Sequence, residues 1–334
     1  MPHLPRRAHA AGLLCAATLL ASACGGSSAG RDAATRSDDG HYPVTVTNCG
    51  DEVTIAAEPT EVVMLKSAVV PFLTSIGVLD RVRAKAGAYP DGYFVGEVRE
   101  QVDGIESLTD RTDASGHLLI SKEAVVEREP DLVLGHASTV DREALDAVGI
   151  PSLEPSGLCT TDLPEPGFEQ VYDEVEMYGR VFDREAEAAA AITDLRERVA
   201  AVTERTKGVE RRTGAVLYPT VGGGTTYAYG AASMPDPLLD AAGIDNVFGD
   251  EDERVFEVTL ERLLEEDPEV IVLLHSDGDP AAVEQALTDL PGADELTAVG
   301  RGDVHVELFN FAEPASPLVV DGLERLVDVV GDAG

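Results

Sequence analysis

The chain has 334 residues, enough for two domains of ordinary size, and its 44% hydrophobic and 26% charged residues are typical of a globular protein. It carries 62 Asp and Glu residues against 25 Lys and Arg residues, a formal net charge of −37. This balance argues against nucleic-acid binding, which relies on Lys and Arg side chains at the phosphates. It also opposes adhesion of the folded surface to anionic lipids.

Residues 1–23 are predicted to be a signal peptide. A start with two arginines is followed by the apolar run Ala10 to Ala23, which is too short to span a bilayer as a helix. The run ends in small residues before Cys24, and this ending resembles the lipobox of bacterial lipoproteins, in which the cysteine is lipidated. Ala21 stands where leucine is commoner in that motif, and an ordinary signal peptide with a chance cysteine is the alternative. No later stretch is long and apolar enough for a transmembrane helix.

The four cysteines can be assigned one by one. Cys15 is expected to leave with the signal peptide. Cys24 is expected to carry lipid at the head of a small, polar stretch, residues 24–41, which we expect to be a flexible tether. Cys49 and Cys159 remain in an oxidising compartment. They are therefore predicted to form a disulfide.

Residues 42–166 predict a first α/β lobe. Residues 44–47 and 53–55 indicate a small hairpin, and residues 62–65 form a short apolar strand. That strand leads into a helical stretch closed by Gly77. Units of strand, loop and helix that alternate in this way are typical of an α/β fold.

An internal repeat predicts a second lobe over residues 208–334. Residues 121–134 (SKEAVVEREPDLVL) and 259–272 (TLERLLEEDPEVIV) align without a gap, and Glu123 matches Glu261. Each copy predicts a hydroxyl N-cap, a short helix, a proline break and a buried strand. The mature chain is therefore expected to hold two lobes of similar plan.

The segment between the lobes, residues 167–207, is predicted to be helical. Apolar residues recur there at spacings of three and four, beginning with Val171, Val175, Tyr178 and Phe182. Asp183 is expected to cap a second helix over 184–206, about 34 Å long at about 1.5 Å per residue. A helix of that length can join two lobes as a stiff strut, and packing on one lobe alone is the alternative.

Ligands of open α/β sheets bind beyond the carboxyl ends of the strands. The glycine-rich stretch 218–230 contributes three tyrosines there, which offer flat apolar surface with polar tips. We expect these tyrosines to face the first lobe across a cleft, although a glycine-rich loop with core tyrosines is the alternative. The candidate ligand-binding residues are Lys66, His136, Tyr218, Tyr227, Tyr229 and His275.

The sequence motifs give little support for a metal site or an enzyme active site. His117, His136 and His275 with Asp277 would suit a divalent metal ion, but their spacing matches no metal motif. The sequence lacks G-x-S-x-G, H-E-x-x-H and P-loop motifs. We therefore expect no catalytic residues and no cofactor.

Several short motifs occur in a definite order: VTV (44–46), EVV (61–63), GVLDRV (77–82), EPDLVL (129–134), GIP (149–151) and DPEVI (267–271). Together they resemble the substrate-binding proteins of bacterial ABC importers for iron–siderophores and cobalamin, over nearly the whole mature chain. The resemblance implies an α/β fold of two Rossmann-like lobes joined by a single long helix, with the ligand cleft between them. It also implies a binding protein rather than an enzyme.

The resemblance further implies a docking surface. In the family a surface glutamate on each lobe stands seven residues before the proline of the repeated block and pairs with arginines of the importer's permease subunits. Glu123 and Glu261 occupy these positions. A pair of first-turn carboxylates that complement the helix dipoles is the alternative, and the two roles are compatible.

The charged residues expected at the cleft narrow the range of possible ligands. The strand ends that would line the cleft carry one lysine and no arginine, whereas an anionic chelate would need arginines. We therefore expect an Fe(III)-siderophore of neutral or cationic type, such as a ferric hydroxamate, held by a protein that is lipid-anchored on the extracytoplasmic face of the cell membrane. The alternatives are cobalamin, a free metal ion bound by histidines, and a lipid-anchored sensor or adhesion domain on the same scaffold.

Overall fold

The computed structural model describes residues 40–112, 117–159, 161 and 163–331. The expected signal peptide, Cys24 and nearly all of the tether lie outside these residues. None of the helices in the described part is both long enough and apolar enough to span a bilayer. All described residues belong to one compact unit.

A β-hairpin precedes the first lobe. Strands β1 (Val44–Asn48) and β2 (Asp51–Ile55) pair in antiparallel register, with Val44 opposite Ile55. Cys49 and Gly50 form the turn, and both have positive φ angles. Cys49 is joined to Cys159 by a disulfide, with a Cα–Cα distance of 5.3 Å, so the expected pairing is present in the structure.

The first lobe is built on a five-stranded parallel sheet in the order β5-β4-β3-β6-β7. Its strands are β3 (Val62–Met64), β4 (Val82–Ala86), β5 (Glu106–Thr109), β6 (Leu132–Leu134) and β7 (Ser152–Leu153). The accompanying helices are α1 (Val70–Ser75), α2 (Gly96–Gly104), α3 (Lys122–Val126) and α4 (Arg142–Asp146). The central strands β3 and β6 are short and buried at every residue, as expected for parallel strands covered on both faces.

Two antiparallel helices follow, α5 (Phe168–Val181) and α6 (Glu185–Thr206). Asp183 lies between them in the left-handed region, with φ of 55°, and the Arg184 N–H donates to the Gly179 carbonyl 2.7 Å away. This is the arrangement of a helix C-terminus rather than of a helix start. The expectation that Asp183 caps α6 is therefore wrong, because the N-cap residue is Arg184.

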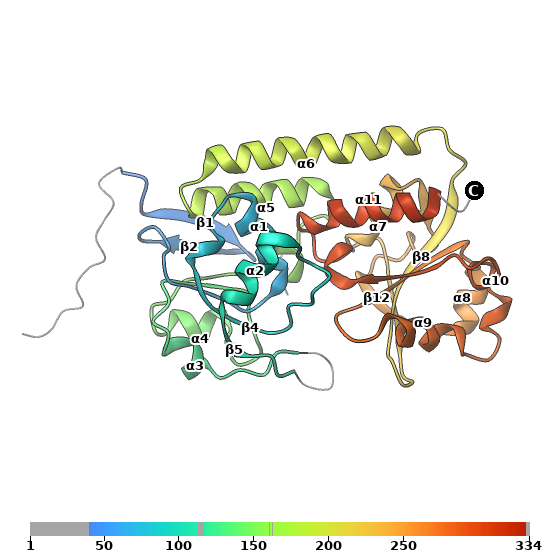
Figure 1. The fold of residues 1–334 in the computed structure, drawn as a ribbon, viewed down its shortest axis with the longest axis horizontal. Helices are drawn as coiled ribbons and strands as arrows, with labels where there is room; N and C mark the ends of the chain where they lie inside the picture. The colour runs from blue at the N-terminus through green and yellow to red at the C-terminus, as the bar shows by residue number, and fades with distance from the viewer. Residues whose placement is uncertain (1–39, 113–116, 160, 162, 332–334) are drawn as a thin grey trace, which may run out of the picture. The chain divides into compact units, whose positions relative to one another are not determined.

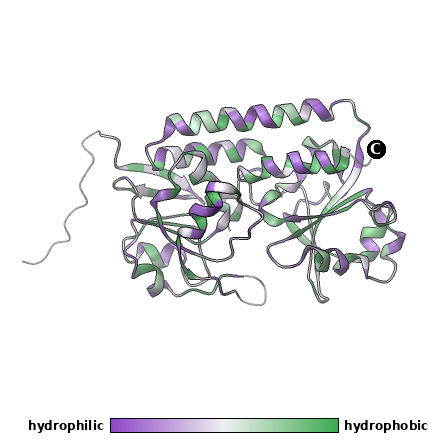
Figure 2. Ribbon diagram, in the orientation of Figure 1, coloured by the Kyte–Doolittle hydropathy of each residue, from purple (hydrophilic) through white to green (hydrophobic). Residues whose placement is uncertain are grey.

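Helix α6 runs beside both lobes and confirms the predicted strut. It contacts α1 and α5 on the first-lobe side and α7 and α11 on the second-lobe side (Figure 1). Its buried residues Ala188, Leu195 and Val202 are spaced by seven, which places them on one face. Polar and apolar residues alternate along the rest of the helix (Figure 2).

The second lobe contains a six-stranded sheet in the order β11-β9-β8-β12-β13, with β10 paired to β8. Its strands are β8 (Arg212–Pro219), β9 (Thr226–Tyr229), β10 (Ile244–Asn246), β11 (Val255–Val258), β12 (Val270–His275) and β13 (Val304–Leu308). Its helices are α7 (Pro235–Ala241), α8 (Leu260–Glu266), α9 (Pro280–Thr288), α10 (Thr297–Arg301) and α11 (Leu318–Gly331). Strands β10, β8, β12 and β13 are parallel, whereas β9 and β11 are antiparallel to their neighbours.

The internal repeat has a structural counterpart. The Ser121 hydroxyl accepts the Ala124 N–H at the start of α3, and the Thr259 hydroxyl accepts the Arg262 N–H at the start of α8. Each helix leads into a strand, β6 or β12, that lies next to the first strand of its own sheet in chain order, β3 or β8. The two copies thus occupy equivalent positions in the two lobes.

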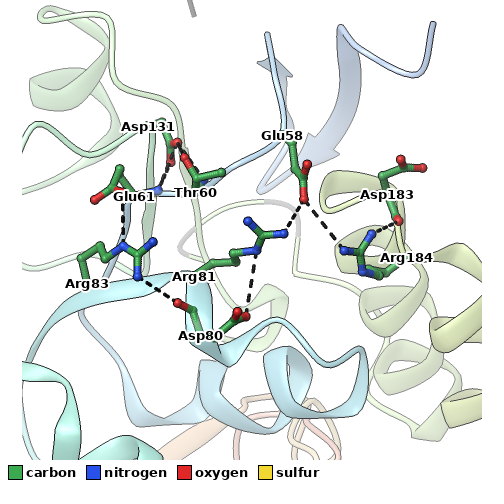
Figure 3. A network of polar contacts seen from close by, with 9 residues as sticks. All are labelled: Glu58, Thr60, Glu61, Asp80, Arg81, Arg83, Asp131, Asp183 and Arg184. Carbon is green, nitrogen blue, oxygen red and sulfur yellow. Dashed lines mark hydrogen bonds and ion pairs between the residues drawn. The ribbon is translucent and has the colours of Figure 1, made fainter. Parts of the chain in front are cut away.

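A network of polar contacts ties the first lobe to the start of α6 (Figure 3). Glu58 accepts from Arg81 at 2.8 Å and lies 3.9 Å from Arg184. The Asp131 carboxylate accepts the backbone N–H groups of Thr60 and Glu61, just before β3. The contact between Glu58 and Arg184 therefore links the start of α6 to the segment before β3.

Candidate functional site

A cavity of about 190 Å³ lies between the lobes, bounded by described residues of both. The first lobe contributes residues that follow β3 and β4, and the second contributes residues that follow β12 and β13. The main polar and aromatic lining residues are Lys66, Ser67, Tyr93, Ser276, Phe309 and Asn310. Larger hollows exist elsewhere, including one of about 920 Å³ beside the disulfide. We take the inter-lobe cavity as the site because the carboxyl ends of strands from both sheets meet there.

Asn310 joins the two lobes across this cavity. Its backbone N–H donates to the Tyr93 hydroxyl at 3.1 Å, and its side-chain Nδ2 donates to the Ser67 hydroxyl at 3.1 Å. The Tyr93 ring also lies 5.6 Å from the Phe311 ring, centroid to centroid. Burial raises the pKa of the Tyr93 hydroxyl well above its ordinary value, so this group stays neutral. The contact surface is therefore aromatic and uncharged.

Lys66 is the cationic group in the cavity lining. Its side chain packs so closely on Gly135 that a Cβ there would lie 2.7 Å from the Lys66 Cγ, and Gly135 has a φ of +90°. Both facts require glycine at position 135. Burial lowers the pKa of the Lys66 ammonium, and the nearby Glu154 carboxylate opposes this effect.

His136 does not line the inter-lobe cavity but pairs with Glu154, the carboxylate near Lys66. Its Nδ1 lies 2.6 Å from Glu154 Oε2, which forms an ion pair when the imidazole is protonated. The Glu154 carboxylate thus interacts electrostatically with both the Lys66 ammonium and the His136 imidazole. The first-lobe end of the site holds one lysine and this histidine–carboxylate pair.

The tyrosine stretch differs from the expected loop. Strands β8 and β9 form an antiparallel hairpin in which Tyr218 faces Tyr227 in register, and the glycine triplet 222–224 lies in the turn between them. Tyr218 reaches the border of the cavity: its hydroxyl lies 3.0 Å from the Ser276 Oγ, and its ring lies 6.1 Å from the Phe309 ring.

The other two tyrosines are not brought to Lys66 and His136. Tyr229 is 3% exposed and belongs to the hydrophobic core. Tyr227 is 37% exposed and does not line the cavity. The expectation that all three tyrosines face the first lobe was wrong for these two: Tyr229 packs in the core, and Tyr227, although it lies opposite Tyr218 in the hairpin, is absent from the cavity lining.

The three cleft histidines do not form a metal site. His275 is 7% exposed, at the end of β12, and its Nδ1 lies 2.9 Å from the Asp277 carbonyl oxygen. Within the described ranges, the one group of three or more His, Cys, Asp or Glu ligand atoms close enough to share an ion is elsewhere in the molecule. His117, His136 and His275 therefore do not converge.

Glu123 and Glu261 occupy equivalent exposed positions. Each lies in the first turn of its helix, α3 or α8, two residues after the capping hydroxyl. Hydrogen bonds from its own backbone N–H and from Thr259 lower the pKa of Glu261, so this carboxylate is ionised. Both residues can present a negative charge to a partner.

Two α/β lobes of like plan, one helix in contact with both, and a cavity at the strand ends define a two-lobed solute-binding protein. The sequence profile of the family described as periplasmic binding protein matches residues 62–306. The chain belongs to this family.

Individual relatives agree with this assignment. The uncharacterized ABC transporter substrate-binding lipoprotein YvrC of Bacillus subtilis is 24% identical over 323 residues, 96% of this chain and 95% of that protein. A cobalamin-binding protein of Halobacterium salinarum is 24% identical over 297 residues, 86% of this chain and 74% of that protein. A crystal structure described as an ABC-type Fe³⁺-hydroxamate transport system from Saccharomonospora viridis is 50% identical, with a TM-score of 0.83, and covers 87% of this chain and 100% of that chain.

Sequence reasoning missed Tyr93, Phe309 and Asn310, which line the cavity. The rule on strand ends would have found two of them, because Phe309 and Asn310 directly follow β13. Tyr93 lies in a loop after β4, and no local pattern marks it.

Proposed function

We propose that this protein captures an iron(III)–hydroxamate chelate in the inter-lobe cavity and delivers it to an ABC importer. The observation that carries the proposal is the lining of the cavity: aromatic rings, neutral hydroxyl and amide groups, one lysine and no arginine. Such a lining suits a ligand with an apolar body and oxygen atoms that accept hydrogen bonds. A chelate with several negative charges would leave those charges without bidentate partners.

The relative from Saccharomonospora viridis supports the same cargo. It is described as part of an Fe³⁺-hydroxamate transport system and shares half of its aligned residues with this chain. Identity at that level, over 87% of the chain, makes a similar class of ligand a reasonable inference. Cobalamin is the second candidate, favoured by the cobalamin-binding relative from Halobacterium salinarum.

The cavity must widen to admit either cargo. Its volume of about 190 Å³ is below the range of about 300–1,000 Å³ that is usual for pockets with drug-sized ligands. Because α6 packs on helices of both lobes, we expect little hinge motion. We propose instead that the turn Phe309–Phe311 and Tyr93 move apart, which would break the hydrogen bond from the Asn310 N–H to the Tyr93 hydroxyl.

Delivery requires two further features, both proposals. Lipidation of Cys24 would hold the protein on the extracytoplasmic face of the membrane, where an importer is within reach. Glu123 and Glu261 would dock on arginines of the permease subunits, one on each lobe. The protein would act by binding and release, without catalysis.

The direct test is a titration of intrinsic tyrosine fluorescence, since the chain has eight tyrosines and no tryptophan. We expect saturable quenching by a ferric hydroxamate at about micromolar concentration or below. Phe309→Ala should weaken the binding, whereas Leu290→Ala, on an exposed residue away from the cavity, should not. If cobalamin alone gave saturable quenching, cobalamin would be the cargo in place of the ferric hydroxamate. If a ferric catecholate alone bound tightly, the inference from the charge of the cavity lining would be refuted.

A further inference from the structure

A histidine and two carboxylates meet at the junction of α5 and α6, away from the inter-lobe cavity. His41 Nδ1 lies 3.4 Å from Asp183 Oδ1 and 3.7 Å from Glu185 Oε1. One ligand atom from each residue lies within 4.8 Å of the others. Neither the binding site nor the docking residues make use of this cluster.

The imidazole is oriented by contacts outside the cluster. His41 Nε2 lies 2.8 Å from the Arg180 carbonyl oxygen. A carbonyl can only accept, so Nε2 carries a proton and donates it. An imidazole held in this way by a backbone carbonyl is typical of a metal ligand, because the bond fixes the ring and directs the other nitrogen to the ion. Here Nδ1 is the nitrogen that faces the two carboxylates.

The segment around His41 is held in place by its neighbours. The Tyr42 hydroxyl donates to the Val181 carbonyl at 2.9 Å, and the Arg180 guanidinium donates to the Thr45 carbonyl at 3.0 Å. These bonds join the start of the described chain to the end of α5. These bonds therefore help to hold the His41 backbone beside the end of α5.

The carboxylates are set in the same way. Asp183 has a left-handed backbone at the turn between the two helices, and Arg184 donates to the backbone oxygen of Asp183, at 2.7 Å (Figure 3). That bond does not involve the Asp183 carboxylate. Glu185 is the first residue of α6. The two carboxylates thus project from a fixed turn next to His41.

The distances favour an ion over a direct hydrogen bond. A charge-assisted N–H···O bond is usually about 2.7–2.9 Å long. Ligand atoms around a tetrahedral Zn²⁺, at about 2.0–2.2 Å from the metal, lie about 3.3–3.6 Å from one another. The separation of 3.4 Å falls within this second range and that of 3.7 Å lies just above it, and both are longer than a direct charge-assisted hydrogen bond. One imidazole nitrogen and two carboxylate oxygens are also a donor set that Zn²⁺ accepts, with water in the fourth position.

We propose that His41, Asp183 and Glu185 bind a divalent cation of the Zn²⁺ type. The ion would link the segment at Gly40 and His41 to the start of the strut helix, and the acidic body would favour its approach. Such a link would fix the point at which the chain enters the folded body. This inference is independent of the cargo in the inter-lobe cavity.

The test uses the protein purified without a polyhistidine tag, freed of metal with a chelator and titrated with Zn²⁺ in a calorimeter. We expect one Zn²⁺ per chain, and a loss of affinity of about tenfold or more in His41→Ala and Asp183→Asn. Asn tolerates the left-handed backbone at position 183, so this variant should keep the fold. Glu185→Gln, on a half-exposed side chain, tests the third ligand with little risk to folding.

Matched controls separate this site from others. His117→Ala, and the pair His136→Ala with His275→Ala, should bind Zn²⁺ as the wild type does. Co²⁺ in place of Zn²⁺ should give visible absorption bands that disappear in His41→Ala. Absence of saturable Zn²⁺ binding, or wild-type affinity in His41→Ala, would overturn the proposal. Loss of binding in the His136 and His275 pair alone would also overturn it.

Discussion

The Asn310 backbone N–H donates a hydrogen bond of 3.1 Å to the hydroxyl of Tyr93, and this bond crosses the boundary between the two lobes. Both residues are buried and both line the inter-lobe cavity. The bond therefore contributes to the contact between the lobes. It lies at the inter-lobe cavity, which is the proposed binding site of the cargo.

Tyr93→Phe is expected to reduce the free energy of unfolding by about 1–3 kcal/mol, because it leaves the buried Asn310 N–H without its acceptor. Tyr227→Phe is the matched control, since its side chain is 37% exposed. That control should change the value by less than about 0.5 kcal/mol. Urea unfolding measures both, and equal effects of the two substitutions would contradict the assigned role of the bond.

Glu174 predicts a pH dependence of stability. It is buried on α5, and its Oε2 accepts from the Ser156 backbone N–H at 3.0 Å and from the Ser156 hydroxyl at 2.5 Å. Among the described residues, its Oε1 and the nearby Tyr178 hydroxyl have no hydrogen-bond partner. Burial raises the pKa of Glu174 from 4.5 to about 7, although the bonds from Ser156 oppose this effect.

The sign of this dependence follows from proton binding. Because the folded state holds the proton more tightly than the unfolded state, the contribution of Glu174 to stability is complete below pH 4.5 and is lost as the pH rises to about 7. The loss is about 3 kcal/mol. Glu174→Gln should remove this pH-dependent loss, so that the free energy of unfolding of the variant rises relative to that of the wild type between these pH values. Glu176 is exposed on the same helix, and the free energy of unfolding of Glu176→Gln should follow a pH curve parallel to that of the wild type. A parallel curve for Glu174→Gln would refute the prediction.

Charge reversal of Glu123 and Glu261 tests docking. The double variant with Arg at both positions should lose uptake by about tenfold or more, because like charges would meet at the importer. Its affinity for the ligand should not change, since both residues are exposed and lie outside the cavity. The control reverses Glu187 and Glu197 on α6, which alters the net charge equally. Equal loss in the control would show a general effect of charge, and loss of ligand affinity would place the glutamates in the site.

Cys24→Ala tests the anchor. A lipidated cysteine carries more than one acyl chain, which is enough for stable attachment to a membrane. The variant should therefore appear in the medium or remain unprocessed, whereas the wild type stays with the membranes after a high-salt wash. Membrane retention of the variant under the same wash would contradict lipidation.

Local sequence patterns were sufficient to predict much of the fold. The repeat around Glu123 and Glu261 and the helix over 184–206 depend on capping, periodicity and proline breaks, which act over a few residues. The structure confirms α6 as Glu185–Thr206 in contact with both lobes. The same local reasoning misjudged Asp183, because an aspartate before a helix is usually a cap, whereas here it ends the preceding helix in a left-handed conformation.

The candidate site was predicted only in part. Lys66 lines the cavity as expected and Tyr218 reaches its border. Tyr229 is buried, because the chain turns at residues 220–225 and returns along the sheet as β9. Tyr93 and Asn310 meet only because two lobes pack together, and no pattern within one segment encodes that contact.

The cargo is tested most directly by mass spectrometry of the small molecule that copurifies with the protein from its own producing cells. We predict a hydroxamate siderophore with one Fe³⁺ per chain in the same fraction, lost from Phe309→Ala and retained by Leu290→Ala. Recovery of cobalamin, or of a catecholate chelate in place of the hydroxamate, would contradict it.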